Sequence, residues 1–324
     1  MSNRVFNGVL CGLLAGAMWG MVFIVPAYLT AFTPLEMACG RYIAYGLIAA
    51  SLLGGRLPPL LRRLDRSDII AMVKHALAGN IVYYMLLALG VQLAGVSATS
   101  LIIGVLPLTV TLMGRKDHGA VPLRQLAWPL LLVAAGIACI NLDVFSHDAG
   151  SGATLPIKLT GVACAVGALL CWTWYSVDNA RYLQRNPHFS SGEWSALYGV
   201  SSGLIALAIA AVALTVFHSD VTGAGAVASG RDWTVFWFVN GLLALGASVI
   251  GNHLWNIASR TVPLTLSGQL ILFETLFALG YGFIYHQQWP RGLEVAAMLL
   301  LVAGVTWSVR VHALGNAATV HPGD

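Results

Sequence analysis

The chain has 324 residues, of which 58% are hydrophobic and only 9% are charged, and its formal net charge is +4. A soluble globular protein carries about 25% charged residues, so this composition excludes a water-soluble enzyme, a nucleic-acid-binding protein and a disordered chain. It is typical of a protein that crosses a lipid bilayer several times, each crossing helix needing about 20 mainly apolar residues.

Ten apolar runs, separated by short polar breaks, predict ten transmembrane helices. In chain order the runs cover residues 7–29, 34–54, 69–91, 97–114, 126–142, 157–180, 193–217, 233–258, 264–284 and 291–312. Lipid leaves only helices and closed barrels able to satisfy their backbone hydrogen bonds, and runs of this length are helical. We therefore expect an all-α polytopic membrane protein with tight connections at 92–96 and 259–263.

The basic residues indicate how these helices are oriented. Of the 17 Lys and Arg residues, 13 fall on the side of the N-terminus, Arg41 lies inside a span, and the remaining three lie on the other side. Those three are Lys158, Arg231 and Arg291. Since cytoplasmic loops carry the excess of Lys and Arg, we expect a multi-pass protein of the cell inner (plasma) membrane with both termini in the cytoplasm.

The two halves of the sequence resemble each other. Trp19 in the first run aligns with Trp172 in the sixth, and Glu36 at the start of the second aligns with Glu193 at the start of the seventh. Because five is odd, a second five-helix unit enters the membrane from the opposite side, which makes an inverted repeat around a central cavity. The predicted divisions are a first unit at 1–148, a second unit at 149–314 and a flexible cytoplasmic tail at 315–324.

This organisation resembles the drug/metabolite transporter superfamily, and each half looks like one EamA-type unit. The motifs behind the resemblance are a Gly- and Ala-rich first helix with a tryptophan, here Trp19 or Trp172, and a fourth helix with an acid or a proline. The second half keeps the acid as Glu274 and the first half keeps the proline as Pro107, so neither half has both. Length, Trp19, Tyr83-Tyr84 and the segment 252–256 look most like amino-acid exporters of the YddG type.

The resemblance implies a membrane exporter of amino acids, including aromatic and other neutral ones, or of related small metabolites. Such a protein works by alternating access and needs neither a cofactor nor a metal. Ten helices suffice for a complete cavity, so we expect a monomer whose partners are a small-molecule substrate and the bilayer. The five cysteines lie in apolar runs without a CxxC motif and are expected to be free thiols.

Polar and aromatic residues inside the spans are the candidates for the cavity, because intramembrane polar groups are costly and often functional. Amides, phenols and imidazole can bond the charged groups of an amino acid, and an indole face can hold an ammonium group. The alternative is that the Asn and His side chains only bridge neighbouring helices. The substrate-binding candidates are Trp19, Asn80, Tyr83, Tyr84, Trp172, Asn252, His253, Asn256 and Gln269.

Two formally charged residues lie deep in the spans. Glu274 could carry a coupling proton or could be a structural partner, and His253 has the same ambiguity. Arg41 could be the counter-ion of Glu36 or a cation of the cavity. Glu36 and Glu193 open their helices, where a carboxylate favours the positive end of the helix dipole, so we expect a structural role for them.

Glycine and proline residues indicate packing and bending. Gly8, Gly12, Gly16 and Gly20 repeat every four residues along the first span, which lets a neighbouring helix backbone approach closely. Pro26 and Pro107 each remove a backbone hydrogen bond and permit a bend, as a gating helix requires.

Two other functions stay open. A multidrug or other metabolite exporter of the same superfamily would have a more apolar cavity. An intramembrane serine hydrolase would use Ser201 or Ser202 as nucleophile with His253 as base, since residues 199–203 read GVSSG. The GxSxG motif, however, works on a strand-to-helix turn, and here it falls inside a predicted span.

Overall fold

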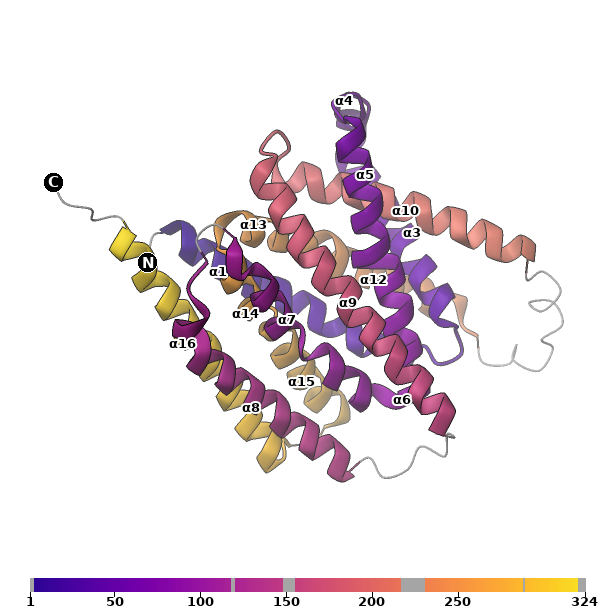
Figure 1. Cartoon of the computed structure of the whole chain (residues 1–324). Coiled ribbons are helices and arrows are strands. Elements are labelled where there is room, and N and C mark those ends of the chain that lie inside the picture. Colours follow the sequence, from indigo (N-terminus) through magenta and orange to yellow (C-terminus); the bar gives the residue numbers. More distant parts are fainter. Residues whose placement is uncertain (1–2, 118–119, 148–154, 217–230, 288, 320–324) are drawn as a thin grey trace.

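The computed structural model describes residues 3–117, 120–147, 155–216, 231–287 and 289–319, and this part of the chain contains helices and no strand (Figure 1). In chain order the α-helices are α1 (Asn3–Gly20), α2 (Val25–Tyr28), α3 (Pro34–Leu53), α4 (Leu57–Arg62), α5 (Arg66–His75), α6 (Val82–Ile103), α7 (Leu106–Met113), α8 (Leu123–His147), α9 (Leu155–Arg185), α10 (Ser191–Val216), α12 (Trp233–Leu243), α13 (Asn252–Thr261), α14 (Leu264–Leu270), α15 (Leu272–His286) and α16 (Gly292–Thr319). The all-α polytopic class predicted from the sequence is confirmed.

Within the described residues, eight segments are long and apolar enough to cross a membrane, and 123–139 forms a shorter apolar helix. The expected fourth span, 97–114, is not one continuous helix. It consists of the second arm of α6 followed by α7, with a break at 104–105. The expected boundary between the two units, at 148–149, falls outside the described residues. Helix α16 continues to Thr319, so the first part of the expected tail is helical.

The chain reverses direction inside α6, as the expected hairpin at 92–96 requires. A Cβ atom on Gly90 would lie 3.1 Å from Oγ1 of Thr99. A straight helix rises about 1.5 Å per residue and would hold residues nine positions apart more than 10 Å from each other. The two arms therefore pack against each other although helical geometry is continuous through the bend.

Two π-helical turns occur at comparable places in the two halves. The first, η3, covers Ala76–Ile81 between α5 and α6, and the second, η6, covers Ala244–Gly251 between α12 and α13. A π-helix is rare and is often found at functional sites. Asn80 lies in the first turn and Asn252 directly follows the second, so both amides depend on this irregular geometry.

Side-chain caps fix where α3 and α10 begin. The Thr33 hydroxyl accepts a hydrogen bond from the Glu36 backbone N–H, and the Glu36 carboxylate accepts one from the Thr33 backbone N–H. Ser190 and Glu193 make the same reciprocal pair at the start of α10. The structural role expected for both glutamates is thus present as two capping boxes.

The main helix pairs each join one helix of the first half to one of the second. They are α1 with α15, α3 with α10, α6 with α9, and α8 with α16. In Figure 1, α8 and α16 run alongside each other at the edge of the molecule. The largest cluster of buried apolar residues contains residues of both halves and forms the core between these helices.

Helices α3 and α10 cross in opposite directions where two glycines meet. A Cβ atom on Gly203 would lie 2.6 Å from the Gly46 Cα atom and 3.1 Å from the Tyr42 carbonyl oxygen. Four residues earlier in α10, Gly199 meets the side chain of Ala49, which lies later in α3. Residues without side chains allow backbones to approach this closely, so the two glycines set how near the halves come at this crossing.

Candidate substrate cavity

A small buried cavity lies where α1, α3, α6, α9, α13 and α15 meet. Its volume is about 20 Å³, which is enough for roughly one water molecule. The residues that line it are Trp19, Val22, Arg41, Tyr42, Gly79, Asn80, Tyr83, Trp172, Tyr175, Asn252 and Glu274. They come from both halves, as expected for a site between two repeats.

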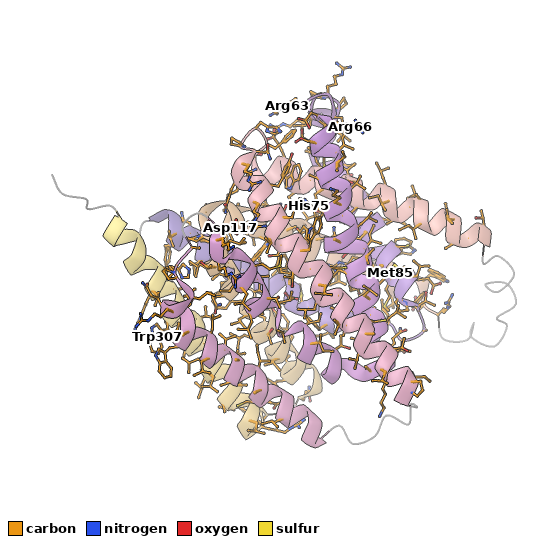
Figure 2. All side chains as sticks on the ribbon, in the orientation of Figure 1. Arg63, Arg66, His75, Met85, Asp117 and Trp307 are labelled. Carbon is orange, nitrogen blue, oxygen red and sulfur yellow. The ribbon has the colours of Figure 1, made fainter. Side chains whose placement is uncertain are left out.

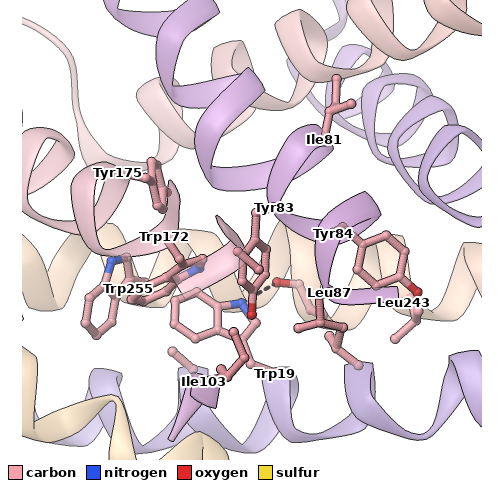
Figure 3. Packing of buried hydrophobic residues seen from close by; sticks show 14 of the residues in the cluster. Trp19, Ile81, Tyr83, Tyr84, Leu87, Ile103, Trp172, Tyr175, Leu243 and Trp255 are labelled. Carbon is pink, nitrogen blue, oxygen red and sulfur yellow. Dashed lines mark hydrogen bonds between the residues drawn. The ribbon is translucent and has the colours of Figure 1, made fainter. Parts of the chain in front are cut away.

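Three tryptophans form one wall of this region (Figure 3). The ring centroids of Trp19 and Trp172 are 5.6 Å apart in an edge-to-face arrangement, and Trp255 lies 5.3 Å from Trp19 and 5.8 Å from Trp172. Tyr83 and Tyr175 extend the wall, at 6.4 and 6.0 Å from Trp172. Such contacts favour fixed ring orientations, so the wall is a rigid aromatic surface.

The second π-turn holds Trp19 in place. The indole Nε1 of Trp19 donates a hydrogen bond to the carbonyl oxygen of Ala247 at 2.9 Å. A Cβ atom on Gly251 would lie 2.8 Å from the same nitrogen. The absence of a side chain at Gly251 therefore lets this indole reach a carbonyl group that the irregular turn exposes.

Arg41 brings a positive charge to the cavity and is 5% exposed. Its Nε donates to the Ser248 hydroxyl at 3.1 Å, and its guanidinium carbon lies 5.1 Å from the Tyr42 ring centroid and 5.0 Å from that of Tyr84. These contacts orient the guanidinium group and leave it without a carboxylate partner among the described residues. The expected alternative, pairing with Glu36, is wrong, because Glu36 binds Arg231 at 3.0 Å.

Glu274 brings a carboxyl group to the same cavity from α15, and it is 7% exposed. Among the described residues, its carboxylate takes part in no hydrogen bond to another side chain and in no ion pair within 4.0 Å. A buried charge without a partner is costly. The guanidinium group of Arg41 and the carboxyl group of Glu274 thus border one small volume, each with capacity left to bind a ligand.

Two amides complete the polar part of the lining. The Asn80 amide donates to the Ser202 hydroxyl at 2.8 Å, and Ser202 donates in turn to the Tyr198 carbonyl oxygen at 2.8 Å. This chain ties the first π-turn to α10. Asn252 lies at the start of α13, next to the second π-turn.

Five of the nine substrate-binding candidates from the sequence line the cavity. They are Trp19, Asn80, Tyr83, Trp172 and Asn252, and the two charged candidates Arg41 and Glu274 join them.

The other four candidates do not line this cavity. Tyr84 is fully buried and packs against Arg41. Gln269 donates to the Thr111 hydroxyl at 2.9 Å. The other two are Asn256, which accepts a hydrogen bond from Asn179 at 3.0 Å, and His253, which lies beside Gly192 at the start of α10. The Asn256 and Gln269 amides bridge helices, which was the alternative for such groups.

Four lining residues were not among the sequence candidates: Val22, Tyr42, Gly79 and Tyr175. Gly79 and Tyr175 act together, because a Cβ atom on Gly79 would lie 2.5 Å from the Tyr175 ring. Their signal in the sequence was weak, since an apolar or aromatic residue inside a span is ordinary. Gly79 directly precedes Asn80, and a glycine beside a candidate polar residue could have indicated that a neighbouring helix approaches closely there.

The glycines of α1 face the hairpin that carries Glu274. A Cβ atom on Gly16 would lie 2.8 Å from the Glu274 backbone nitrogen, and one on Gly20 would lie 2.8 Å from that of Ala278. Gly8 and Gly12 instead meet side chains, those of residues 261–262 and 270. The stripe therefore sets how close Glu274 stands to α1.

The prolines stand at the starts of short helices. Pro26 lies in the first turn of α2 and Pro107 in the first turn of α7, each directly after a break in a longer span. Their missing N–H groups cost nothing at these positions, so both mark the ends of rigid segments.

The serine hydrolase alternative finds little support in the geometry. The Ser202 hydroxyl is engaged by Asn80 and by a backbone carbonyl group inside α10. Within the described part of the chain, no histidine forms a hydrogen bond with Ser201 or Ser202. The same residues contain no group of three His, Cys, Asp or Glu side chains that could hold a metal ion, and all five cysteines are free thiols.

Comparison with known proteins agrees with this architecture. Residues 6–142 match the EamA-like transporter family. The chain is 32% identical over 319 residues to the inner membrane protein YtfF of Escherichia coli (strain K12), covering 94% of this chain and 96% of that protein. A crystal structure of a protein 17% identical to this one has the same fold, with a TM-score of 0.68 over 94% of this chain and 98% of that chain.

Proposed function

The chain belongs to the EamA-like transporter family of the drug/metabolite transporter superfamily, and we propose that it carries neutral amino acids or closely related zwitterions across the inner membrane. The relative with 32% identity is named an inner membrane protein. The helices long and apolar enough to span a bilayer support the same location for this chain.

One observation carries the choice of substrate: Arg41 and Glu274 border the same cavity with opposite charges. A guanidinium group binds a carboxylate through two parallel hydrogen bonds. A carboxylate and the aromatic faces of Trp19 and Trp172 suit an ammonium group. An amino acid carries both groups on one carbon atom, and the tryptophan wall offers its side chain an apolar surface.

Alternating access supplies the mechanism. A cavity with room for about one water molecule is too small for an amino acid, so helices must separate before one can enter. The pairing of each main helix with a helix of the other half supports a motion of one half against the other. Outward transport, cytoplasmic termini and a monomeric unit belong to the same proposal. The bias of Lys and Arg to one side supports the cytoplasmic termini, and a cavity built within one chain supports a monomeric unit.

Transport into reconstituted vesicles tests the substrate. We expect uptake of neutral and aromatic amino acids, with competition by free amino acids. Competition should weaken for the methyl ester, which lacks the carboxylate, and for the deaminated acid, which lacks the ammonium group. Equal competition by all three compounds would overturn the proposal.

Single substitutions test whether Arg41 and Glu274 bind the substrate. We expect Arg41→Gln and Glu274→Gln each to lower uptake by about tenfold or more, because each removes a charge-assisted contact of roughly 1.5–3 kcal/mol. His253→Ala is the matched control, since this intramembrane residue lies outside the lining, and it should change uptake by less than about twofold. Repeating the assay with and without a pH gradient shows whether Glu274 carries a coupling proton, because Glu274→Gln would then abolish the effect of the gradient.

A multidrug exporter is the second candidate, favoured by the aromatic wall. Lipophilic cations would use the tryptophans and Glu274, but the nearby charge of Arg41 would repel them. Uptake of a fluorescent lipophilic cation that is stimulated by Arg41→Gln would favour this alternative over amino-acid transport.

A further inference from the structure

A cluster of three contacts, which we name clasp A, joins Arg231 to the start of α3. Nη2 of Arg231 lies 3.0 Å from Oε2 of Glu36, and its Nε donates to the Ala31 carbonyl oxygen at 3.2 Å. The guanidinium carbon stands 5.3 Å from the centroid of the Phe32 ring. The ion pair is partly buried, with side-chain exposures of 22% and 28%.

A second cluster, which we name clasp B, joins Arg63 to the start of α10. Nη1 of Arg63 lies 3.5 Å from Oε1 of Glu193, and its Nη2 donates to the His188 carbonyl oxygen. The guanidinium carbon stands 5.0 Å from the centroid of the Phe189 ring. This pair is more open, with side-chain exposures of 48% and 34%.

The two clasps use the same short sequence pattern. Residues 31–36 read AFTPLE and residues 188–193 read HFSSGE, so each has Phe, Thr or Ser, and Glu at the same spacing. In both, the Glu caps its helix, the Phe ring lies beside the guanidinium group, and the residue before the Phe supplies the carbonyl oxygen. The arginine comes each time from the opposite half of the chain, so each clasp ties the halves together.

The clasps lie on opposite sides of the crossing between α3 and α10. Glu36 stands ten residues before Gly46, and Glu193 stands ten residues before Gly203. Each clasp is thus about 15 Å of helix from the glycine contact. Because the helices run in opposite directions there, the two glutamates lie toward opposite ends of the molecule, and Figure 2 shows Arg63 at one tip.

We propose that clasps A and B are the two latches of alternating access, each keeping one entrance of the cavity closed. Opening toward one face requires Arg231 to leave Glu36, and opening toward the other requires Arg63 to leave Glu193. Both latches are engaged here, in agreement with the small volume of the cavity. Partly exposed ion pairs are weak enough to break and reform readily. The inference depends on transport by alternating access, as in the proposed function, and not on the identity of the substrate.

Thiol labelling tests the latches without any substrate. The full chain, with its five cysteines replaced and Val22→Cys in the cavity lining as reporter, is placed in vesicles of both orientations and treated with a membrane-impermeant maleimide. We expect Glu36→Gln to raise the labelling rate about two- to fivefold from the side of clasp A only, the shift that loss of one partly exposed ion pair produces. Glu193→Gln should do the same from the side of clasp B only. Glutamine keeps the capping box intact, so the helix starts are preserved.

Two controls separate a latch from general loosening. Arg62→Gln changes an exposed arginine next to clasp B and should leave both labelling rates unchanged. Arg231→Gln removes the other partner of the ion pair and leaves the capping box intact, and it should raise labelling from the side of clasp A as Glu36→Gln does. Equal labelling from both sides in either glutamine variant, or unchanged labelling in both while the protein stays monodisperse, would overturn the latches. Side-specific labelling without amino-acid transport would support the latches and refute the substrate alone.

Discussion

Replacing Gly203 by Ala tests the crossing of α3 and α10 most directly. The added Cβ atom would lie 2.6 Å from the Gly46 Cα atom and 3.1 Å from a carbonyl oxygen of the same helix. Carbon atoms pack best at about 3.5–4.0 Å, so the two backbones must move apart by about 1 Å. Overpacking of this kind costs about 1–3 kcal/mol. In a chain of this size that corresponds to a fall in Tm of roughly 2–10 °C.

Thermal unfolding in detergent, followed by tryptophan fluorescence, measures the effect. Gly280→Ala is the matched control, since among the described residues nothing lies within 4 Å of a Cβ atom at this helical position. There the alanine should be neutral or raise Tm slightly, because glycine inside a helix costs about 0.5–1 kcal/mol relative to alanine. If Gly203→Ala unfolds at or above the temperature of Gly280→Ala, the close contact between the halves is refuted.

Three further substitutions test other contacts. Gly16→Ala should lower Tm more than Gly12→Ala, because Gly16 meets backbone atoms of α15 whereas Gly12 meets a leucine side chain that can rotate; equal melting temperatures would count against this. Trp19→Phe removes the donor to a buried carbonyl oxygen of the second π-turn and should destabilise by about 1–3 kcal/mol, seen as a lower Tm. Arg181→Lys loses one of two bonds, each 2.9 Å long, to the partly exposed Asp117 and should cost no more than about 1 kcal/mol, so a large drop in Tm would contradict its exposed setting.

Composition and hydropathy were sufficient to predict the all-α membrane fold. In lipid, an apolar run of this length can satisfy its backbone hydrogen bonds by forming a helix and in few other ways. The same pattern located Arg41 and Glu274 deep in the spans, and the cost of buried charge explains why such residues are informative. Trp19 and Trp172 emerged from the internal similarity of the halves. The predictions for Arg41 and Glu274 rest on the residue type alone, whereas those for Trp19 and Trp172 rest on a comparison of the two halves.

Which residues of each helix point toward the cavity was harder to predict. Asn252 and Asn256 lie one turn apart in the regular helix α13. The small cavity reaches Asn252, whereas Asn256 lies one turn further along the helix and accepts a hydrogen bond from Asn179. The π-turn Ala244–Gly251, directly before this pair, sets which way their shared face points. A π-turn cannot be recognised from the amino-acid composition, because its residues are ordinary helix residues.

Two of the missed lining residues, Gly79 and Tyr175, meet at the first π-turn. Gly79 lies inside the first π-turn and makes room for Tyr175, a residue almost a hundred positions later. Neither residue type is unusual in a membrane helix. Their pairing depends on how α9 docks against the turn, and that is information from tertiary packing.

The contact of Trp19, Trp172 and Trp255 has an optical consequence. These are three of the ten tryptophans of the chain, and their ring centroids are 5.3 to 5.8 Å apart. Indoles at such separations exchange excitation energy, and two of the three face the cavity. Any movement that widens the space between α1 and α9 alters this exchange, so the emission of the unlabelled protein should report directly on the state of its interior.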